Sequence, residues 1–141
     1  NLRSSDVIKA SKIEASLAGS GDVDLPLEGD EIRVSVSGSG ELKARVQSQN
    51  LIAALAGSGD ILLDGSTQSI EVKVSGSGNV RARSLESKTA KVSIAGSGDV
   101  EVVSRDEIYA RVSGSGDIDY YGKPPKQYIK VSGSGKVMMK N

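Results

Sequence analysis

The segment "LAGSGDV" at Leu17 to Val23 recurs in nearly the same form six more times along the 141-residue chain. The further copies are "VSGSGEL" (36–42), "LAGSGDI" (55–61), "VSGSGNV" (74–80), "IAGSGDV" (94–100), "VSGSGDI" (112–118) and "VSGSGKV" (131–137). Successive GSG triplets therefore begin at a near-constant interval of about 19 residues. A catalytic site is normally assembled once, so a motif repeated in this way indicates a requirement of the architecture.

Apolar and polar residues alternate on both sides of each triplet. In "ELKARV" the residues Leu42, Ala44 and Val46 would face one side of a strand, and the charged residues between them the other side. A helix is disfavoured because two glycines per repeat and frequent Val, Ile and Ser oppose it. Repeats of this length cannot bury an apolar face alone and must stack on their neighbours. The sequence therefore predicts an all-β fold, a parallel β-solenoid.

The triplet glycines are predicted to form sharp corners, where the backbone has a positive φ and adjacent coils approach too closely for a Cβ atom. These corner residues are Gly19, Gly21, Gly38, Gly40, Gly57, Gly59, Gly76, Gly78, Gly96, Gly98, Gly114, Gly116, Gly133 and Gly135. The serine at the centre of each triplet is expected to align with its equivalents and to hydrogen-bond to them or to nearby backbone groups.

The number of corners in each coil has two solutions. The residue before the triplet alternates between Ala and Ser, and "LKAR" (42–45) and "VRAR" (80–83) follow only the second and fourth triplets, which favours two corners in a coil of about 38 residues. Stacking at about 19 residues would instead align Asp24, Lys43, Leu62, Arg81 and Glu101 in a column of alternating charge. We favour one corner per coil.

Composition excludes several classes of function. The chain contains no Cys and no His, so the commonest zinc ligands, thiol nucleophiles and the usual general base at neutral pH are missing. Eighteen basic and 18 acidic side chains give a formal net charge of +0, which argues against nucleic acid as a partner. No apolar run has the length of a transmembrane segment. We expect no cofactor.

The series of "[AS]GSG[DEN][VIL]" motifs resembles the head GIN domain of the putative auto-transporter adhesin family, found in bacterial secreted and surface proteins. The resemblance covers nearly the whole chain and owes its specificity to the repetition. It implies a right-handed, single-stranded β-helix like that of the pectin lyases, with GSG at the tight turns and no recognised catalytic residues. Family members usually have a longer N-terminal part, so residues 1–141 are expected to be one repeat domain from the C-terminal portion of a longer protein.

An acidic residue follows five of the seven triplets. These residues are Asp22, Glu41, Asp60, Asp99 and Asp117. Stacking would bring like charges close together, which invites a calcium ladder comparable to that of glycine-rich nonapeptide repeats. The present repeat is twice as long, however, and Lys136 follows the last triplet. We therefore favour no metal, with each acid accepting backbone N–H bonds at a turn.

Tyr109, Tyr121 and Tyr128 are the candidate ligand contacts. Tyr109 and Tyr128 occupy equivalent positions before their triplets, so they would stack on successive coils and point outward. With Tyr121 and the "GKPPKQ" loop (122–127) they form the most distinctive predicted surface, and aromatic side chains are effective contacts for sugars and proteins. The alternative is cross-coil stacking that closes the C-terminal end of the solenoid.

These features predict a non-enzymatic cell-surface or secreted module that mediates adhesion by contacting a glycan or a protein. Its partners would be an unidentified surface glycan or protein, or further copies of the chain, and its location extracellular, at the cell surface or periplasmic. The alternative is a polysaccharide-binding or polysaccharide-processing β-helix, because a glycosidase needs only two carboxylates in unlike environments. Repeated, exposed acids seldom acquire such environments, which favours the adhesion module.

Overall fold

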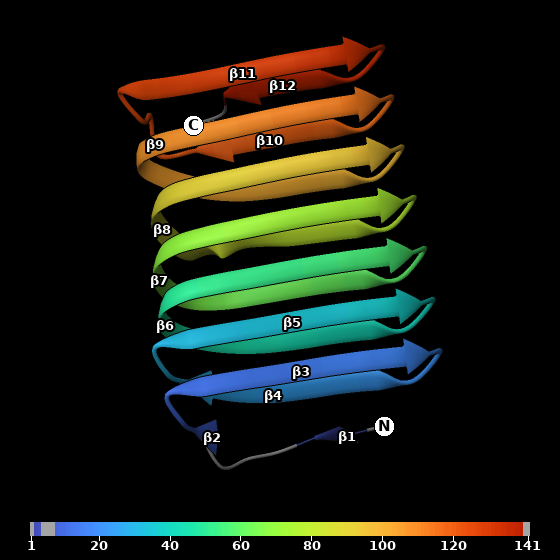
Figure 1. Ribbon diagram of the computed structural model, residues 1–141, viewed down its shortest axis with the longest axis vertical. Helices are drawn as coiled ribbons and strands as arrows, with labels where there is room; N and C mark the ends of the chain where they lie inside the picture. The colour runs from blue at the N-terminus through green and yellow to red at the C-terminus, as the bar shows by residue number, and fades with distance from the viewer. Residues whose placement is uncertain (1, 4–7, 140–141) are drawn as a thin grey trace.

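The computed structural model describes residues 2–3 and 8–139, which form a solenoid of stacked coils with β1 at one end and β12 at the other (Figure 1). All strand pairings are parallel. The strands are β1 (Leu2–Arg3), β2 (Ile8–Lys9), β3 (Lys12–Gly19), β4 (Asp22–Glu28), β5 (Glu31–Gly38), β6 (Glu41–Gly57), β7 (Asp60–Gly76), β8 (Asn79–Gly96), β9 (Asp99–Gly114), β10 (Asp117–Tyr121), β11 (Lys126–Gly133) and β12 (Lys136–Met139). The described residues contain no helix long and apolar enough to cross a membrane.

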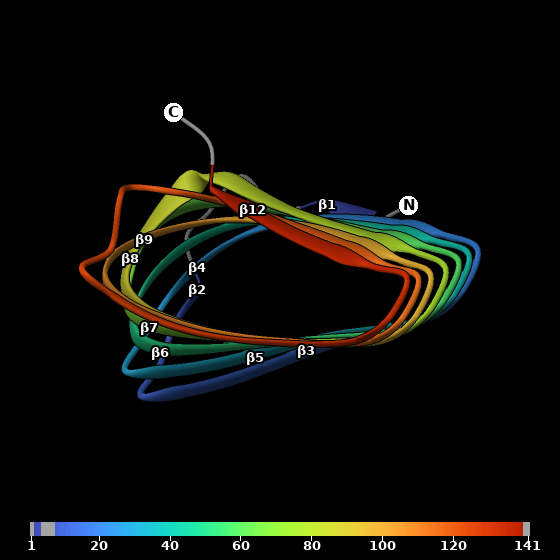
Figure 2. The same cartoon turned by 90° about the horizontal axis from the view of Figure 1, so that it is seen from above.

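Each coil has two flat sides. The front sheet contains β3, β5, the second parts of β6 to β9 and β11, and the back sheet contains β1, β2, β4, the first parts of β6 to β9, β10 and β12. Figure 2 shows that the two sheets meet on one edge at a sharp corner of the same shape in successive coils. On the other edge, which we call the curved edge, the bend is rounded in the middle coils and more angular in the first and last ones. The chain runs along the near side of Figure 1 toward the sharp corner, returns along the far side and climbs, so the coil is right-handed.

The GSG triplets stack directly on one another at the sharp corner. The first glycines pair in the order Gly19, Gly38, Gly57, Gly76, Gly96, Gly114 and Gly133, each with its equivalent in the next repeat. This register confirms one corner per coil of about 19 residues. The predicted column of Asp24, Lys43, Leu62, Arg81 and Glu101 is also in register on the back sheet.

Backbone hydrogen bonds join each triplet to the previous one. The carbonyl oxygen of Gly38 accepts N–H bonds from both Ser58 and Gly59 at 3.0 Å, and the pattern recurs along the solenoid. Gly57 has a φ of 109°, and a Cβ at this position would lie 2.6 Å from the Gly38 carbonyl oxygen. Only glycine fits such an approach. The serine contributes its backbone N–H, and among the described residues no triplet serine hydroxyl forms the predicted hydrogen bond.

The core is a set of aliphatic columns between the two sheets. One column consists of the residue two positions before each triplet and is buried at Val36, Leu55, Val74, Ile94 and Val112. Its members at the two ends differ, because Leu17 is only partly buried and Val131 is 40% exposed. Burial of such a side chain stabilises by about 1.5–3 kcal/mol, so each coil depends on a neighbour on either side.

The curved edge accommodates two repeats of unequal length, a longer one from Gly76 to Gly96 and a shorter one from Gly96 to Gly114. The register shifts between Leu62 and Asp64 and again between Ala82 and Glu86, whereas the triplets stay aligned. Inside this bend the hydroxyl of Ser104 donates to the carbonyl oxygen of Lys88 at 3.1 Å, and that of Thr67 donates to the carbonyl of Ser69 at 3.0 Å. Lys88 is missing from the registered pairs of β8 and β9, so Ser104 satisfies a carbonyl group that the shifted register leaves outside the regular pairing.

Replacing Gly57 with Ala tests the corner. We expect the free energy of unfolding to fall by about 3 kcal/mol or more, because positive-φ strain adds to a clash with the backbone of the previous coil. Gly19→Ala is the matched control: Gly19 has a φ of 101°, but no atom of the described residues lies within 4 Å of its Cβ position. In the control, the free energy of unfolding should fall only by the cost of the positive-φ strain, about 1–2 kcal/mol. If urea denaturation gave the same loss of unfolding free energy for both variants, close contact between the coils would not require glycine at position 57.

Candidate functional site

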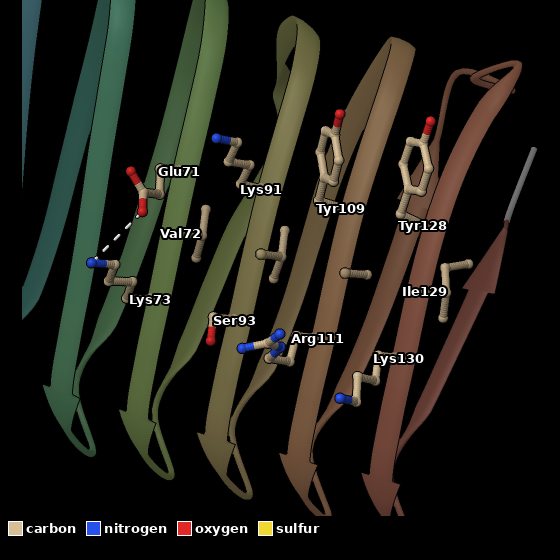
Figure 3. Close-up of a pocket in the computed structure, with 12 residues that line it drawn as sticks. Glu71, Val72, Lys73, Lys91, Ser93, Tyr109, Arg111, Tyr128, Ile129 and Lys130 are labelled. Carbon is tan, nitrogen blue, oxygen red and sulfur yellow. Dashed lines mark ion pairs between the residues drawn. The ribbon is translucent and has the colours of Figure 1, made fainter.

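A shallow groove of about 640 Å³ crosses the front sheet from β7 to β11, and we call it the front groove (Figure 3). It lies between two columns of side chains that point away from the core. One column contains Glu71, Lys91, Tyr109 and Tyr128, and the other contains Lys73, Ser93, Arg111 and Lys130. The residues between the columns point inward because side chains alternate along a strand, so their backbone forms the floor.

Tyr109 and Tyr128 form a parallel stacked pair at the C-terminal end of the front groove. Their ring centroids are 4.8 Å apart and their planes differ by 8°. The Tyr109 hydroxyl donates a hydrogen bond of 2.9 Å to the Glu107 carboxylate, and this bond is the main cause that raises the pKa of Tyr109. The Lys91 ammonium lies 5.8 Å from the centroid of Tyr109. Tyr109 is therefore covered on both faces, whereas Tyr128 remains 54% exposed.

The other two tyrosines lie elsewhere. Tyr121 belongs to β10 in the back sheet, where the Arg83 guanidinium lies 4.6 Å from its ring centroid, so the structure does not bring it together with Tyr109 and Tyr128. Tyr120 points into the core, and burial raises its pKa. Its hydroxyl donates to Oε1 of Gln127 at 2.8 Å, and Nε2 of Gln127 donates to the Pro124 carbonyl. Tyr120 thus holds the "GKPPKQ" loop against the last coil.

Four cations beside the tyrosine pair were not predicted. Lys73, Lys91, Arg111 and Lys130 each come from a different coil. Each has apolar neighbours on both sides in the sequence and lies about one repeat length from the next, so no local run of basic residues marks them. Reading the sequence in the register of the triplets would have found them, because Lys73, Arg111 and Lys130 occupy the same position before their triplets and Lys91 occupies the position of Tyr109.

The basic segments that the sequence does display lie on the back sheet. "LKAR" and "VRAR" place Lys43, Arg45, Arg81 and Arg83 around a second hollow of about 530 Å³. Three carboxylates, those of Asp24, Asp64 and Glu101, share this hollow. The mixture of charges is typical of solvated strand faces.

The acidic residues after the triplets stack in register at the sharp corner. Oδ1 of Asp99 accepts a 3.3 Å bond from the Asp117 backbone N–H, and Oδ1 of Asp117 accepts a 3.1 Å bond from that of Lys136. The Lys43 ammonium lies 3.7 Å from the Glu41 carboxylate. No group of three or more potential ligands that could hold a metal ion occurs within residues 2–3 and 8–139. These bonds are of the kind expected for a turn role, and the calcium ladder stays an untested alternative.

Residues 26–124 match the model of a protein family described as putative auto-transporter adhesin, head GIN domain. Among solved structures, the chain is similar to a putative lipid binding protein from Parabacteroides distasonis ATCC 8503, with a TM-score of 0.88 and 32% identity over 99% of this chain. The chain spans 60% of the length of that protein. A putative adhesin from Bacteroides fragilis NCTC 9343 has a TM-score of 0.74 over 95% of this chain and 94% of its own, and at 17% identity this likeness shows the fold alone. No curated protein matches the chain.

A double-mutant cycle tests whether the tyrosine pair also stabilises the end of the solenoid. Stacked aromatic pairs contribute about 0.5–1.5 kcal/mol beyond their burial, so Tyr109→Ala and Tyr128→Ala should couple by that amount. The free energies of unfolding of the two single variants and the double variant give the coupling directly. A coupling near zero would leave the pair without a structural role.

Calcium should not stabilise this chain. Oxygens of Asp99 and Asp117 already accept backbone hydrogen bonds, and Lys136 ends the acidic column with a positive charge. We expect the same Tm in excess EDTA and in millimolar calcium. A Tm that rises with calcium, and that Asp60→Asn lowers only when calcium is present, would instead establish the ladder.

Proposed function

We propose that this chain, which belongs to the family of putative auto-transporter adhesins with a head GIN domain, is a non-enzymatic adhesion module that holds a glycan on its front sheet. Such a role calls for a location where surface glycans are accessible, extracellular, at the cell surface or periplasmic. The stacked rings of Tyr109 and Tyr128 are the single observation that carries the proposal. Exposed, rigid aromatic side chains bind sugars and proteins at low entropic cost.

The composition of the front groove favours binding over hydrolysis. Glu71 is the carboxylate that lines it, together with phenol, ammonium, guanidinium and hydroxyl groups. Glycoside hydrolysis requires two carboxyl groups at a defined separation, one of them with a raised pKa. Hydrogen-bond donors around an aromatic pair instead suit a ligand rich in hydroxyl groups, which is bound and released unchanged.

A lipid is the second candidate ligand, suggested by the name of the Parabacteroides distasonis structure. The observation that favours it is a group of apolar side chains at the C-terminal end, each at least 40% exposed: Ile129, Val131, Met138 and Met139. Three of them are in register with buried residues of the preceding coil, Val131 with Val112, Ile129 with Ala110 and Met139 with Tyr120. Their exposure follows from their place in the last described coil, which makes this evidence weaker than the tyrosine pair.

A glycan array tests the proposed function. The chain should bind a defined set of glycans, and Tyr109→Ala/Tyr128→Ala should abolish that binding because it removes the aromatic contact. Tyr121→Ala is the matched control, since Tyr121 lies on the back sheet and its loss should leave binding unchanged.

Circular dichroism must show that both variants keep their β structure. If the double variant still bound glycans, the binding site would lie elsewhere than at the tyrosine pair. A chain that binds no glycan but binds lipid vesicles would favour the second candidate.

A further inference from the structure

The front groove collects positive charge in a chain whose formal net charge is +0. Four successive coils each supply one cation, Lys73, Lys91, Arg111 and Lys130, against the one carboxylate of Glu71. Neighbouring strands of a sheet lie about 4.8 Å apart, so this row of cations, with Lys91 in one column and the other three in the opposite column, extends along the solenoid axis for roughly 14 Å. A ligand that matches this row is extended and carries negative charge at more than one point.

Two of the four cations are available to such a ligand. Lys73 is already paired with Glu71, the ammonium nitrogen lying 3.6 Å from the carboxylate oxygen. Arg111 and Lys130 form no ion pair with any residue that the structure describes. In Figure 3 both side chains extend from their strands toward the preceding coil, over the front groove. An anion placed there meets two unpaired positive charges.

The tyrosine pair also favours an anionic, oxygen-rich ligand. Lys91 and Tyr128 cover the two faces of Tyr109, and its hydroxyl already donates to Glu107, so the pair offers its ring edges and the hydroxyl of Tyr128. The edge of an aromatic ring is the positive side of its quadrupole and attracts oxygen atoms. The Ser93 hydroxyl adds a further hydrogen-bonding group on the opposite side of the groove.

A polysaccharide fits these features better than a membrane surface. Ile129 and Val131 are in register with the buried residues Ala110 and Val112, so they take inward positions and do not project beside the cations. Insertion into the interface of a bilayer requires apolar side chains that project next to the basic ones.

We infer that the front groove binds an acidic polysaccharide lying along the solenoid axis, with its carboxylate or sulfate groups against Arg111 and Lys130 and its hydroxyl groups against the tyrosine pair. The planar guanidinium of Arg111 matches the two oxygens of such a group. This inference rests on the proposed function. It adds that the ligand is negatively charged and that it lies along the solenoid axis.

Three polymers with the same backbone test the charge: dextran, carboxymethyl-dextran and dextran sulfate, each titrated against the intact chain. We expect a Kd at least about tenfold lower for one or both charged polymers than for dextran, with affinity falling as salt rises because exposed ionic contacts are screened. Arg111→Gln/Lys130→Gln should raise that Kd about tenfold. Arg45→Gln/Arg81→Gln removes the same charge from the back sheet and should leave the Kd unchanged.

If both double variants lost the same affinity for the charged polymers, binding would depend on the net charge of the chain and not on the front groove. That result would overturn the inference. Binding of neutral glycans through the tyrosine pair, with no preference for the charged polymers, would also overturn it and leave the proposed function standing. Failure to bind any glycan, on the array or among these polymers, would overturn both. Binding to phosphatidylglycerol vesicles but not to the charged dextrans would reject the polysaccharide in favour of a lipid surface.

Discussion

The structure depends on one backbone contact, in which the carbonyl of the first triplet glycine accepts two N–H bonds from the next coil. The contact at Gly38 shows both requirements: Ser58 and Gly59 donate to it, and Gly57 must lack a side chain for the approach to occur. It fixes how close the coils lie and which residue stacks on which. The aliphatic columns of the core follow from that register, since Val36, Leu55 and Val74 meet only when their triplets are aligned.

The same register makes a surface out of isolated residues. Tyr109 and Tyr128 are a full repeat apart in the chain, yet their rings stack because their strands are neighbours. The ion pairs on the exposed faces contribute little, since surface pairs are worth about 0–1 kcal/mol. Stability therefore comes from the corners and the core, and the outward columns are free to differ from coil to coil. The fold therefore does not require particular side chains at the outward-facing positions that line the front groove.

The fold could be predicted because the same interval and the same alternation recur seven times, which specifies both the strands and their stacking. The tyrosine pair could be predicted for the same reason, from its equivalent positions in two repeats. Tyr121 could not be placed, because a short loop carries the chain from the back sheet to the front sheet between it and Tyr128. The row of cations was missed because its members are neighbours only after folding. The side-chain bond of Ser104 at the curved edge depends on a local register shift that no repeated pattern encodes.

The two edges of the coil respond differently to a change in chain length. At the sharp corner an additional residue would disrupt the close contact between its own triplet and the triplets of the neighbouring coils. At the curved edge the chain already carries repeats of unequal length and the "GKPPKQ" loop without disturbing the alignment of the triplets. Insertions are therefore tolerated at one edge only, so foreign peptides grafted between Gly122 and Lys126 would be displayed from a scaffold whose coils keep their spacing.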